Sequence, residues 1–267
     1  MKFGFIGCGN MGGALLAAVV KTVGGNHVYA SDPNEEKLAQ CKLFYHCHVG
    51  DTESLVENCD YLFLGVKPQI YPALFEELAP LLALRSKTPP TLISMAAGIS
   101  VSAVEQLARC DTPIIRIMPN TPVLVEEGMI LYTYNNRVTK KILEGFLSAM
   151  IKAGTLDEIA EDKIDAASAL SGCGPAFVYM FAEALADGAI QCGLPREKAL
   201  LYAAQTLHGA SKLMMESDKT PGELRDAVCS PGGTTIEGVR ALEGNGFHES
   251  AMQAITAAYK RTLELKK

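Results

Sequence analysis

Two glycine-rich stretches of this sequence combine a flexible backbone with the start of a helix, an arrangement suited to binding anions. The first, GFIGCGNMGG, places Gly7, Gly9 and Gly12 in the pattern G-x-G-x-x-G. The second, SPGGTT at 230–235, follows more than 200 residues later and adds two hydroxyl side chains to a glycine pair. Phosphate or carboxylate binding is therefore the chemistry to test at both places.

The first stretch has the surroundings that a dinucleotide-binding turn requires, with a strand-like run at 3–6 before it and a helical run at 11–20 after it. In such a turn Gly7 permits the tight bend, Gly9 lets a pyrophosphate approach the backbone, and Gly12 lets helix and strand pack closely. The stretch therefore predicts a nicotinamide dinucleotide as cofactor.

Asp32 ends the second strand-like run, where a carboxylate hydrogen-bonds the ribose hydroxyls of NAD. The same charge repels the additional phosphate of NADP, although Asn34 and Lys37 follow closely and soften that conflict. The sequence leaves NADP(H) and NAD(H) open as the cofactor.

Further loops follow the carboxyl ends of later strands, where ligands of open α/β sheets bind. Lys67 in one of them is interpreted as electrostatic support for a phosphate rather than as a catalytic group. Asn120, in the loop 118–122, can hydrogen-bond a carboxamide or a substrate. The predicted cofactor site comprises Ile6, Gly7, Cys8, Gly9, Asn10, Met11, Asp32, Gly65, Val66, Lys67, Pro68, Met95, Ala96 and Ala97.

The second stretch is too short to wrap a dinucleotide, which already has its own site. Pro231 ends the preceding helix, and Gly232 and Gly233 expose backbone N–H groups beside the hydroxyls of Thr234 and Thr235. A small carboxylate is the predicted ligand. A plain helix N-cap, which needs one threonine and no glycine pair, is the alternative without function.

Strand-like and helix-like runs alternate through the first half of the chain, which is typical of βαβ units. We predict an α/β fold: a Rossmann-type doubly wound parallel sheet at residues 1–160, then an all-α oligomerisation domain at 161–267. The run 129–134 and a helix at 138–152, with Gly154 as its C′ residue, are expected to complete the sheet domain.

The predicted helix 176–191 is apolar on nearly all sides, because Tyr179, Glu183, Asp187 and Gln191 form one thin polar stripe. A thin helical layer cannot cover such a helix, so a second subunit is expected to do so.

The formal net charge of −6 disfavours nucleic acid and anionic membranes as partners. We expect no membrane span, no signal peptide and a cytoplasmic location. No metal is predicted either, because neighbouring residues in the cluster of Cys41, His46, Cys47 and His48 would point to opposite faces of a strand.

The segments GFIGCGNMG, VKP, MPNTP, LSGCGPAF and RDAVCSPGGTTIEGVRALE together resemble pyrroline-5-carboxylate reductase over essentially the whole chain. The resemblance implies reduction of the cyclic imine 1-pyrroline-5-carboxylate to L-proline with NADPH or NADH, the last step of proline biosynthesis. It also implies a homodimer with interlocked helical domains, which can assemble into a larger ring. Asp32 departs from the neutral residue common among NADPH-preferring members.

The resemblance implies that Thr235 is the catalytic hydrogen-bond partner of the substrate ring nitrogen. The implied substrate-binding residues are Asn120, Gly172, Gly174, Gly232, Gly233, Thr234 and Thr235. A β-hydroxyacid dehydrogenase would place a catalytic lysine on the long helix after the Rossmann domain, but residues 164–191 contain no lysine or histidine. A regulatory dinucleotide-binding protein without turnover is the other alternative.

Overall fold

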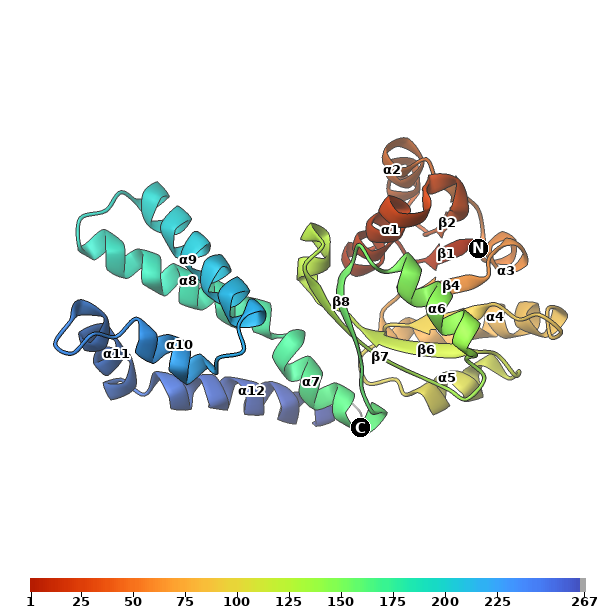
Figure 1. The fold of residues 1–267 in the computed structure, drawn as a ribbon. Coiled ribbons are helices and arrows are strands. Elements are labelled where there is room, and N and C mark those ends of the chain that lie inside the picture. The colour runs from red at the N-terminus through yellow and green to blue at the C-terminus, as the bar shows by residue number, and fades with distance from the viewer. Residues whose placement is uncertain (265–267) are drawn as a thin grey trace. The chain divides into compact units, whose positions relative to one another are not determined.

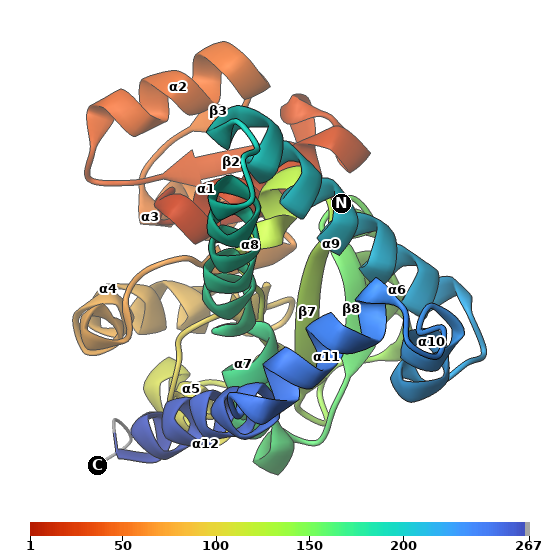
Figure 2. The same cartoon turned by 90° about the vertical axis from the view of Figure 1, so that its left-hand side faces the viewer.

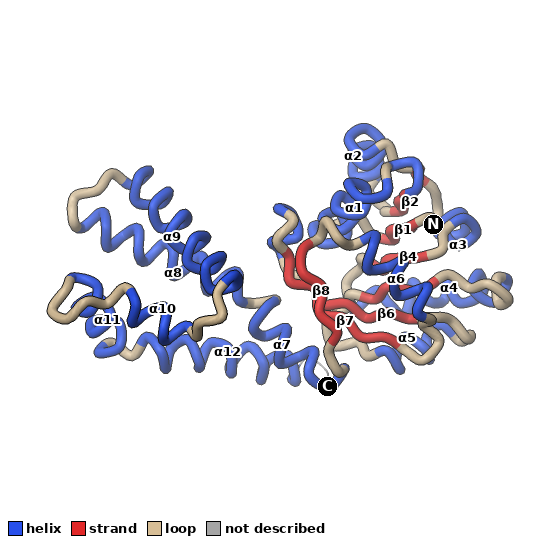
Figure 3. Tube along the Cα trace, viewed as in Figure 1, coloured by secondary structure: helices blue, strands red, loops and turns tan. Residues whose placement is uncertain are grey.

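The computed structural model describes residues 1–264, which divide into two compact units. The first unit comprises Met1–Gly172 and the chain from Tyr259 onward, and the second comprises Cys173–Ala258. Strands occur in the first unit, and the described residues after Glu158 are helices and loops (Figures 1 and 3). The predicted change from alternating elements to helices is therefore confirmed.

Within residues 1–264, eight strands form one sheet in the order β3-β2-β1-β4-β5-β6-β7-β8. Buried apolar side chains such as those of Phe5 and Phe63, whose rings stack 4.4 Å apart, form its centre. The chain order reverses between β1 and β4, so ligands are expected beside the carboxyl ends of these two strands. The strands are β1 (Phe3–Ile6), β2 (Val28–Ser31), β3 (His48–Val49), β4 (Tyr61–Leu64), β5 (Thr91–Ser94), β6 (Ile114–Met118), β7 (Gly128–Tyr134) and β8 (Gly154–Glu158).

Helices pack on both faces of this sheet, as in doubly wound folds. Apolar side chains of α1 (Asn10–Val23), α2 (Glu35–Tyr45) and α6 (Lys140–Ala149) share one buried cluster. Those of α3 (Thr52–Asn58), α4 (Tyr71–Leu84) and α5 (Val101–Ala108) share another. The remaining elements of the first unit are η1 (Gly25–His27), η2 (Pro68–Ile70), η3 (Thr121–Val125), η4 (Glu161–Lys163) and α7 (Ile164–Ser171).

The far edge of the sheet differs from the prediction. β7 runs antiparallel to β6, because the connection through η3 is too short for a crossover helix. Gly154 does not terminate a helix: α6 ends at Ala149, and Gly154 begins β8 with φ of 126°. A Cβ atom there would lie 2.1 Å from the carbonyl oxygen of Gly128, so glycine is needed for strand pairing.

The first unit extends to Gly172, beyond the predicted boundary at residue 160, because α7 packs against β7. Arg116 on β6 is 2% exposed, and its guanidinium pairs with Glu161 at 2.9 Å and with Asp165 at 3.5 Å. These ion pairs hold the start of the helical region to the sheet.

The second unit contains α8 (Gly174–Gln191), α9 (Arg196–Glu216), α10 (Pro221–Ala227), α11 (Thr234–Gly244) and most of α12 (Phe247–Glu264). α8 and α9 lie side by side in both cartoon views (Figures 1 and 2). Gly193, at φ of 98°, lies in their connection. Thr220 and Glu223 form a capping box at the start of α10.

The buried core of the second unit is very small, since its cluster contains the side chains of Ala186, Ala199 and Ala203. Large apolar side chains on α8 are exposed instead, including Met180 at 70%. Among the described residues, one helical stretch, Glu161–Gln191, is long and apolar enough to cross a membrane by length and composition. A turn between α7 and α8 interrupts this stretch.

Candidate functional site

The glycine turn after β1 is packed closely at two of its glycines and open at the third. Gly7 has φ of 93°, which favours glycine, and a Cβ atom on Gly12 would lie 2.1 Å from the carbonyl oxygen of Gly7. A Cβ atom on Gly9 would meet nothing within 4 Å. α1 begins at Asn10 with no side-chain cap, so its first N–H groups remain available to a ligand.

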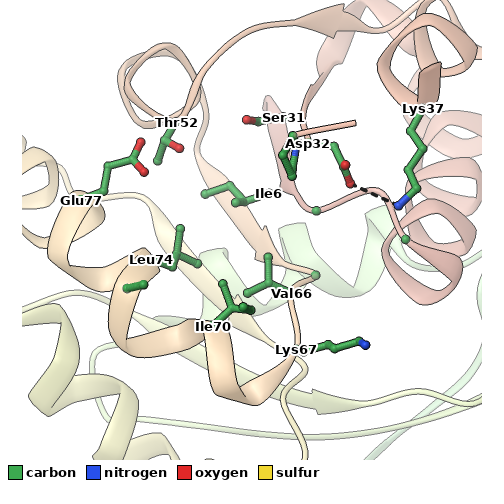
Figure 4. A pocket seen from close by; sticks show the side chains of 15 residues that line it. Ile6, Ser31, Asp32, Lys37, Thr52, Val66, Lys67, Ile70, Leu74 and Glu77 are labelled. Carbon is green, nitrogen blue, oxygen red and sulfur yellow. Dashed lines mark ion pairs between the residues drawn. The ribbon is translucent and has the colours of Figure 1, made fainter. Parts of the chain in front are cut away.

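This open side of the turn faces a cavity of about 540 Å³ beside the carboxyl ends of β1 and β4 (Figure 4). The structure therefore brings together seven of the predicted cofactor residues, including Lys67. The seven that line the cavity are Ile6, Gly7, Gly9, Asp32, Gly65, Val66 and Lys67.

Asp32 is tied to the glycine turn by hydrogen bonds. Its Oδ2 accepts from the backbone N–H of Cys8 at 2.7 Å, and its Oδ1 accepts from the N–H of Asn34 at 2.9 Å. The ammonium of Lys37 lies 3.7 Å from Oδ2, as the dashed line in Figure 4 marks. The carboxylate is only 6% exposed, so its first role is to hold the turn. Its contact with a ribose remains a prediction.

The second glycine turn is also the start of a helix. Gly232 has φ of 69°, and the N–H of Gly233 donates to the carbonyl of Ser230 at 3.0 Å. α11 follows with Gly233 as N-cap and no side-chain cap, and Thr234 and Thr235 are exposed.

The charge at this helix start is mixed. Glu237 is the acidic residue in the first turn of α11, and Arg240 pairs with it at 2.8 Å. The arginine compensates a carboxylate that would otherwise oppose an anion, so this turn can accept a small carboxylate through N–H groups and hydroxyls.

Comparison with known proteins covers the whole chain. A family model described as pyrroline-5-carboxylate reductase dimerisation matches residues 161–265, and one described as NADP oxidoreductase, coenzyme F420-dependent, matches residues 2–98. Pyrroline-5-carboxylate reductase from Escherichia coli (strain K12) is 36% identical over 100% of this chain and 98% of the relative. The chain belongs to the pyrroline-5-carboxylate reductase family.

Solved structures of this family superpose on the chain. The pyrroline-5-carboxylate reductase of Coxiella burnetii has a TM-score of 0.90 at 32% identity, covering 100% of this chain and 98% of that one. The Plasmodium falciparum pyrroline carboxylate reductase, solved with NADP bound, has a TM-score of 0.87 at 31% identity with the same coverage. The resemblance inferred from the motifs and the predicted combination of Rossmann and helical domains are confirmed.

The remaining predicted cofactor residues lie outside the main cavity. Cys8 and Asn10 line a second cavity of about 200 Å³ on the α2 side of the turn. Pro68 begins η2, directly after Lys67. The other four also lie in the first unit. Ala96 is buried, Ala97 is exposed, and Met11 and Met95 are partly buried. Their contact with a cofactor stays a prediction.

Asn120 has a structural role that the sequence did not reveal. Its amide oxygen accepts from the N–H of Met129 at 2.8 Å, and its amide nitrogen donates to the carbonyl of Ser171 at 2.9 Å. The residue is 8% exposed and links β7 to the end of α7. The prediction that Asn120 contacts the substrate receives no support from this geometry.

The predicted substrate-binding glycines Gly172 and Gly174 flank the boundary between the two units. Gly172 caps the end of α7, and a Cβ atom on it would lie 2.8 Å from the carbonyl oxygen of Ser168. Gly174 begins α8, and a Cβ atom on it would meet nothing within 4 Å. The contact of either glycine with substrate stays a prediction.

Sequence reasoning missed part of the cavity wall and a buried tyrosine behind it. The missed lining residues on α3 and α4 are Thr52, Ala73, Leu74 and Glu77, and those near the ends of β2 and η2 are Ser31, Pro33 and Ile70. Position at the end of β2 is the signal that could have indicated Ser31 and Pro33.

The hydroxyl of Tyr71 donates to the carbonyl of Leu64 at 3.2 Å and lies 3.1 Å from Ser94 Oγ. These two contacts join the ends of β4 and β5. Burial raises the pKa of Tyr71 to about 12, so it stays a neutral hydrogen-bonding group.

Proposed function

We infer that this chain catalyses the NAD(P)H-dependent reduction of 1-pyrroline-5-carboxylate to L-proline. Membership of the reductase family over the full length supports the reaction. The observation that carries the cofactor assignment is the open space at Gly9 within an otherwise tightly packed turn. The NADP bound to the Plasmodium falciparum relative supports the same assignment.

When bound, the reduced dinucleotide supplies a hydride for the C=N bond. The N–H groups at the start of α1 bind the pyrophosphate, and Asp32 holds the turn through the N–H of Cys8. Lys67 lines the same cavity and adds positive charge beside the phosphates.

The substrate carboxylate and ring bind the second glycine turn in this proposal. Gly232 offers its backbone N–H group, whereas that of Gly233 is bonded to Ser230, and Thr234 and Thr235 offer exposed hydroxyls at the start of α11. Thr235 Oγ hydrogen-bonds the ring nitrogen. Because a protonated iminium already attracts hydride, correct orientation and proximity supply much of the catalysis.

A second copy of this chain covers the helical unit. The exposed apolar groove of about 440 Å³ between α8 and α12 supports this, with Phe177, Met180, Phe181 and Phe247 in its wall. The family model described as a dimerisation domain supports it further. We propose an interlocked homodimer, a further assembly of dimers into a ring, and a cytoplasmic location.

One assay separates this function from the two alternatives. NADPH or NADH is mixed with the purified chain and 1-pyrroline-5-carboxylate, and the loss of reduced nicotinamide absorbance is recorded. Turnover with the imine and none with β-hydroxyacids in the oxidative direction supports the reductase. Binding of the cofactor without turnover of either substrate would indicate a regulatory protein instead.

Thr235→Ala tests the role of the second turn. The hydrogen bond to a charged partner is worth about 1.5–3 kcal/mol, so kcat should fall roughly 10- to 100-fold while the affinity for cofactor is unchanged. Thr235→Val should behave in the same way, because it restores the shape and lacks only the hydroxyl. If both variants keep the wild-type kcat/KM, Thr235 has no catalytic role and serves only at the start of the helix.

A further inference from the structure

Three buried thiols gather beside the cofactor turn, on the side that the reaction does not use. Cys8 lies within the turn, Cys41 lies on α2, and Cys47 precedes β3; they are 7%, 5% and 4% exposed. All three belong to the same buried cluster, and the Cys47 Sγ lies 3.8 Å from the carbonyl oxygen of Tyr45. The proposed mechanism gives none of these sulfur atoms a role.

Cys8 and Cys41 share a small cavity that gives them a route to solvent. This cavity of about 200 Å³ adjoins the one that Gly9 faces, because Lys37 lines both, and Asn10 and Tyr45 also contribute to its wall. Cys47 does not line it. Cys8 and Cys41 therefore border open space, whereas Cys47 is enclosed in the core.

The pKa values of the two thiols are shifted in opposite directions, which favours Cys41 as the attacking sulfur. A hydrogen bond from the Cys8 thiol lowers the pKa of Cys41, against the opposing effects of burial and of Asp32. The same hydrogen bond, followed by burial, raises the pKa of Cys8. A thiolate is the reactive form of cysteine, so Cys41 is the sulfur that reacts first.

We propose that Cys8 and Cys41 are a redox-sensitive pair, and that hydrogen peroxide converts them to a reversible disulfide that disables the cofactor turn.

The reaction balances in two steps. The Cys41 thiolate attacks one oxygen of hydrogen peroxide, the O–O bond breaks, and Cys41 becomes a sulfenic acid while the departing hydroxide takes up a proton. The sulfur of Cys8 then attacks the Cys41 sulfur, the S–O bond breaks, and the leaving hydroxide takes the Cys8 proton to form water. Two thiols are oxidised by two electrons, and one peroxide becomes two waters.

The disulfide acts on the turn because Cys8 is part of it. Its backbone N–H donates to Asp32, and its neighbours Gly7 and Gly9 set the approach of the pyrophosphate. Bonding its side chain to α2 pulls this segment away from the geometry that binds phosphate. This consequence rests on the proposed function, whereas formation of the disulfide does not.

The test uses the full-length chain exposed to hydrogen peroxide and then quenched. Peptide mass mapping should find Cys8 linked to Cys41, with the loss of two hydrogens reversed by dithiothreitol. NADPH titration should show at least a tenfold weaker affinity after oxidation and full recovery after reduction. Prior saturation with NADPH should slow the oxidation, because the occupied turn is held in place.

Two matched variants identify the pair. Cys41→Ala removes the attacking thiol and should leave NADPH affinity resistant to peroxide, whereas Cys47→Ala, which removes another buried thiol of the cluster, should behave as wild type.

Two results of the peptide map would overturn the proposal: a disulfide involving Cys47, or no Cys8–Cys41 peptide in the oxidised wild-type chain. The second result is obtained on the wild-type protein and does not depend on the folding of a variant. A mapped Cys8–Cys41 disulfide with unchanged NADPH affinity would overturn the switch. Failure of the reduced chain to bind NADPH would contradict the proposed function and leave the peptide map as the test of the pair.

Discussion

Gly9→Val separates ligand binding from folding at the first glycine turn. Gly9 has φ of −69°, which valine can adopt, and a Cβ atom there has no neighbour within 4 Å. The free energy of unfolding should therefore change by less than about 1 kcal/mol. The added side chain occupies the space through which a phosphate reaches the N–H groups of α1. Losing one hydrogen bond to a charged phosphate costs about 1.5–3 kcal/mol, or roughly 10- to 100-fold in affinity.

The companion variant Gly12→Ala should show the opposite pattern in stability. Its Cβ atom would lie 2.1 Å from the carbonyl oxygen of Gly7, a backbone atom, so α1 must move away from β1. Overpacking of this kind costs about 1–3 kcal/mol. NADPH fluorescence titration and thermal unfolding of both variants make the comparison. Wild-type affinity in a folded Gly9→Val protein would refute the assignment of the turn.

Three further outcomes are expected. Asp32→Asn removes the charged acceptor of the Cys8 N–H and the negative charge beside the cavity. The affinity for NADH should therefore fall more than the affinity for NADPH. Equal losses of the two affinities in paired titrations would show that Asp32 only holds the turn. Hydrogen bonds from the N–H and hydroxyl of Thr220 lower the pKa of Glu223, so its stabilisation is present above the unfolded pKa and is lost as pH falls through the lower folded value. The thermal midpoints of wild type and Glu223→Gln should thus differ most near neutral pH and converge in acid, and a constant difference would contradict the capping role. Sedimentation at micromolar concentration should give a mass of at least a dimer, and a monomer would contradict the inferred cover of α8.

Much of the first unit could be predicted from the sequence because its signals are local. The strand 3–6 matches β1, and the runs at 28–31 and 61–64 are fully or partly buried strands as their composition indicated. Gly7 and Gly12 carry their roles in the backbone itself, since a positive φ and a close approach each require glycine. The glycine pattern thereby located the tightly packed turn that we propose for the cofactor without any tertiary information.

Long-range pairing decided features that the sequence alone did not show. β8 reads GTLDE and is largely exposed, so it lacks the apolar pattern of a buried strand and exists because it pairs with β7. Asp32 was placed correctly along the chain, but the N–H of Cys8, which folding brings to it, determines where its carboxylate points. Asn120 is likewise occupied by partners from β7 and α7.

The sequence by itself determined the alternation of strands and helices in most of the first unit, the two glycine turns and the apolar character of α8, because each depends on residues close together in the chain. The tertiary structure decided which side chains surround the cofactor cavity, since Thr52, Leu74 and Glu77 come from helices that only the strand order brings beside Gly9. It also decided that the thiols of Cys8 and Cys41 share a cavity. Side-chain neighbours across a sheet depend on topology, whereas a turn or a helix start depends mainly on its own few residues.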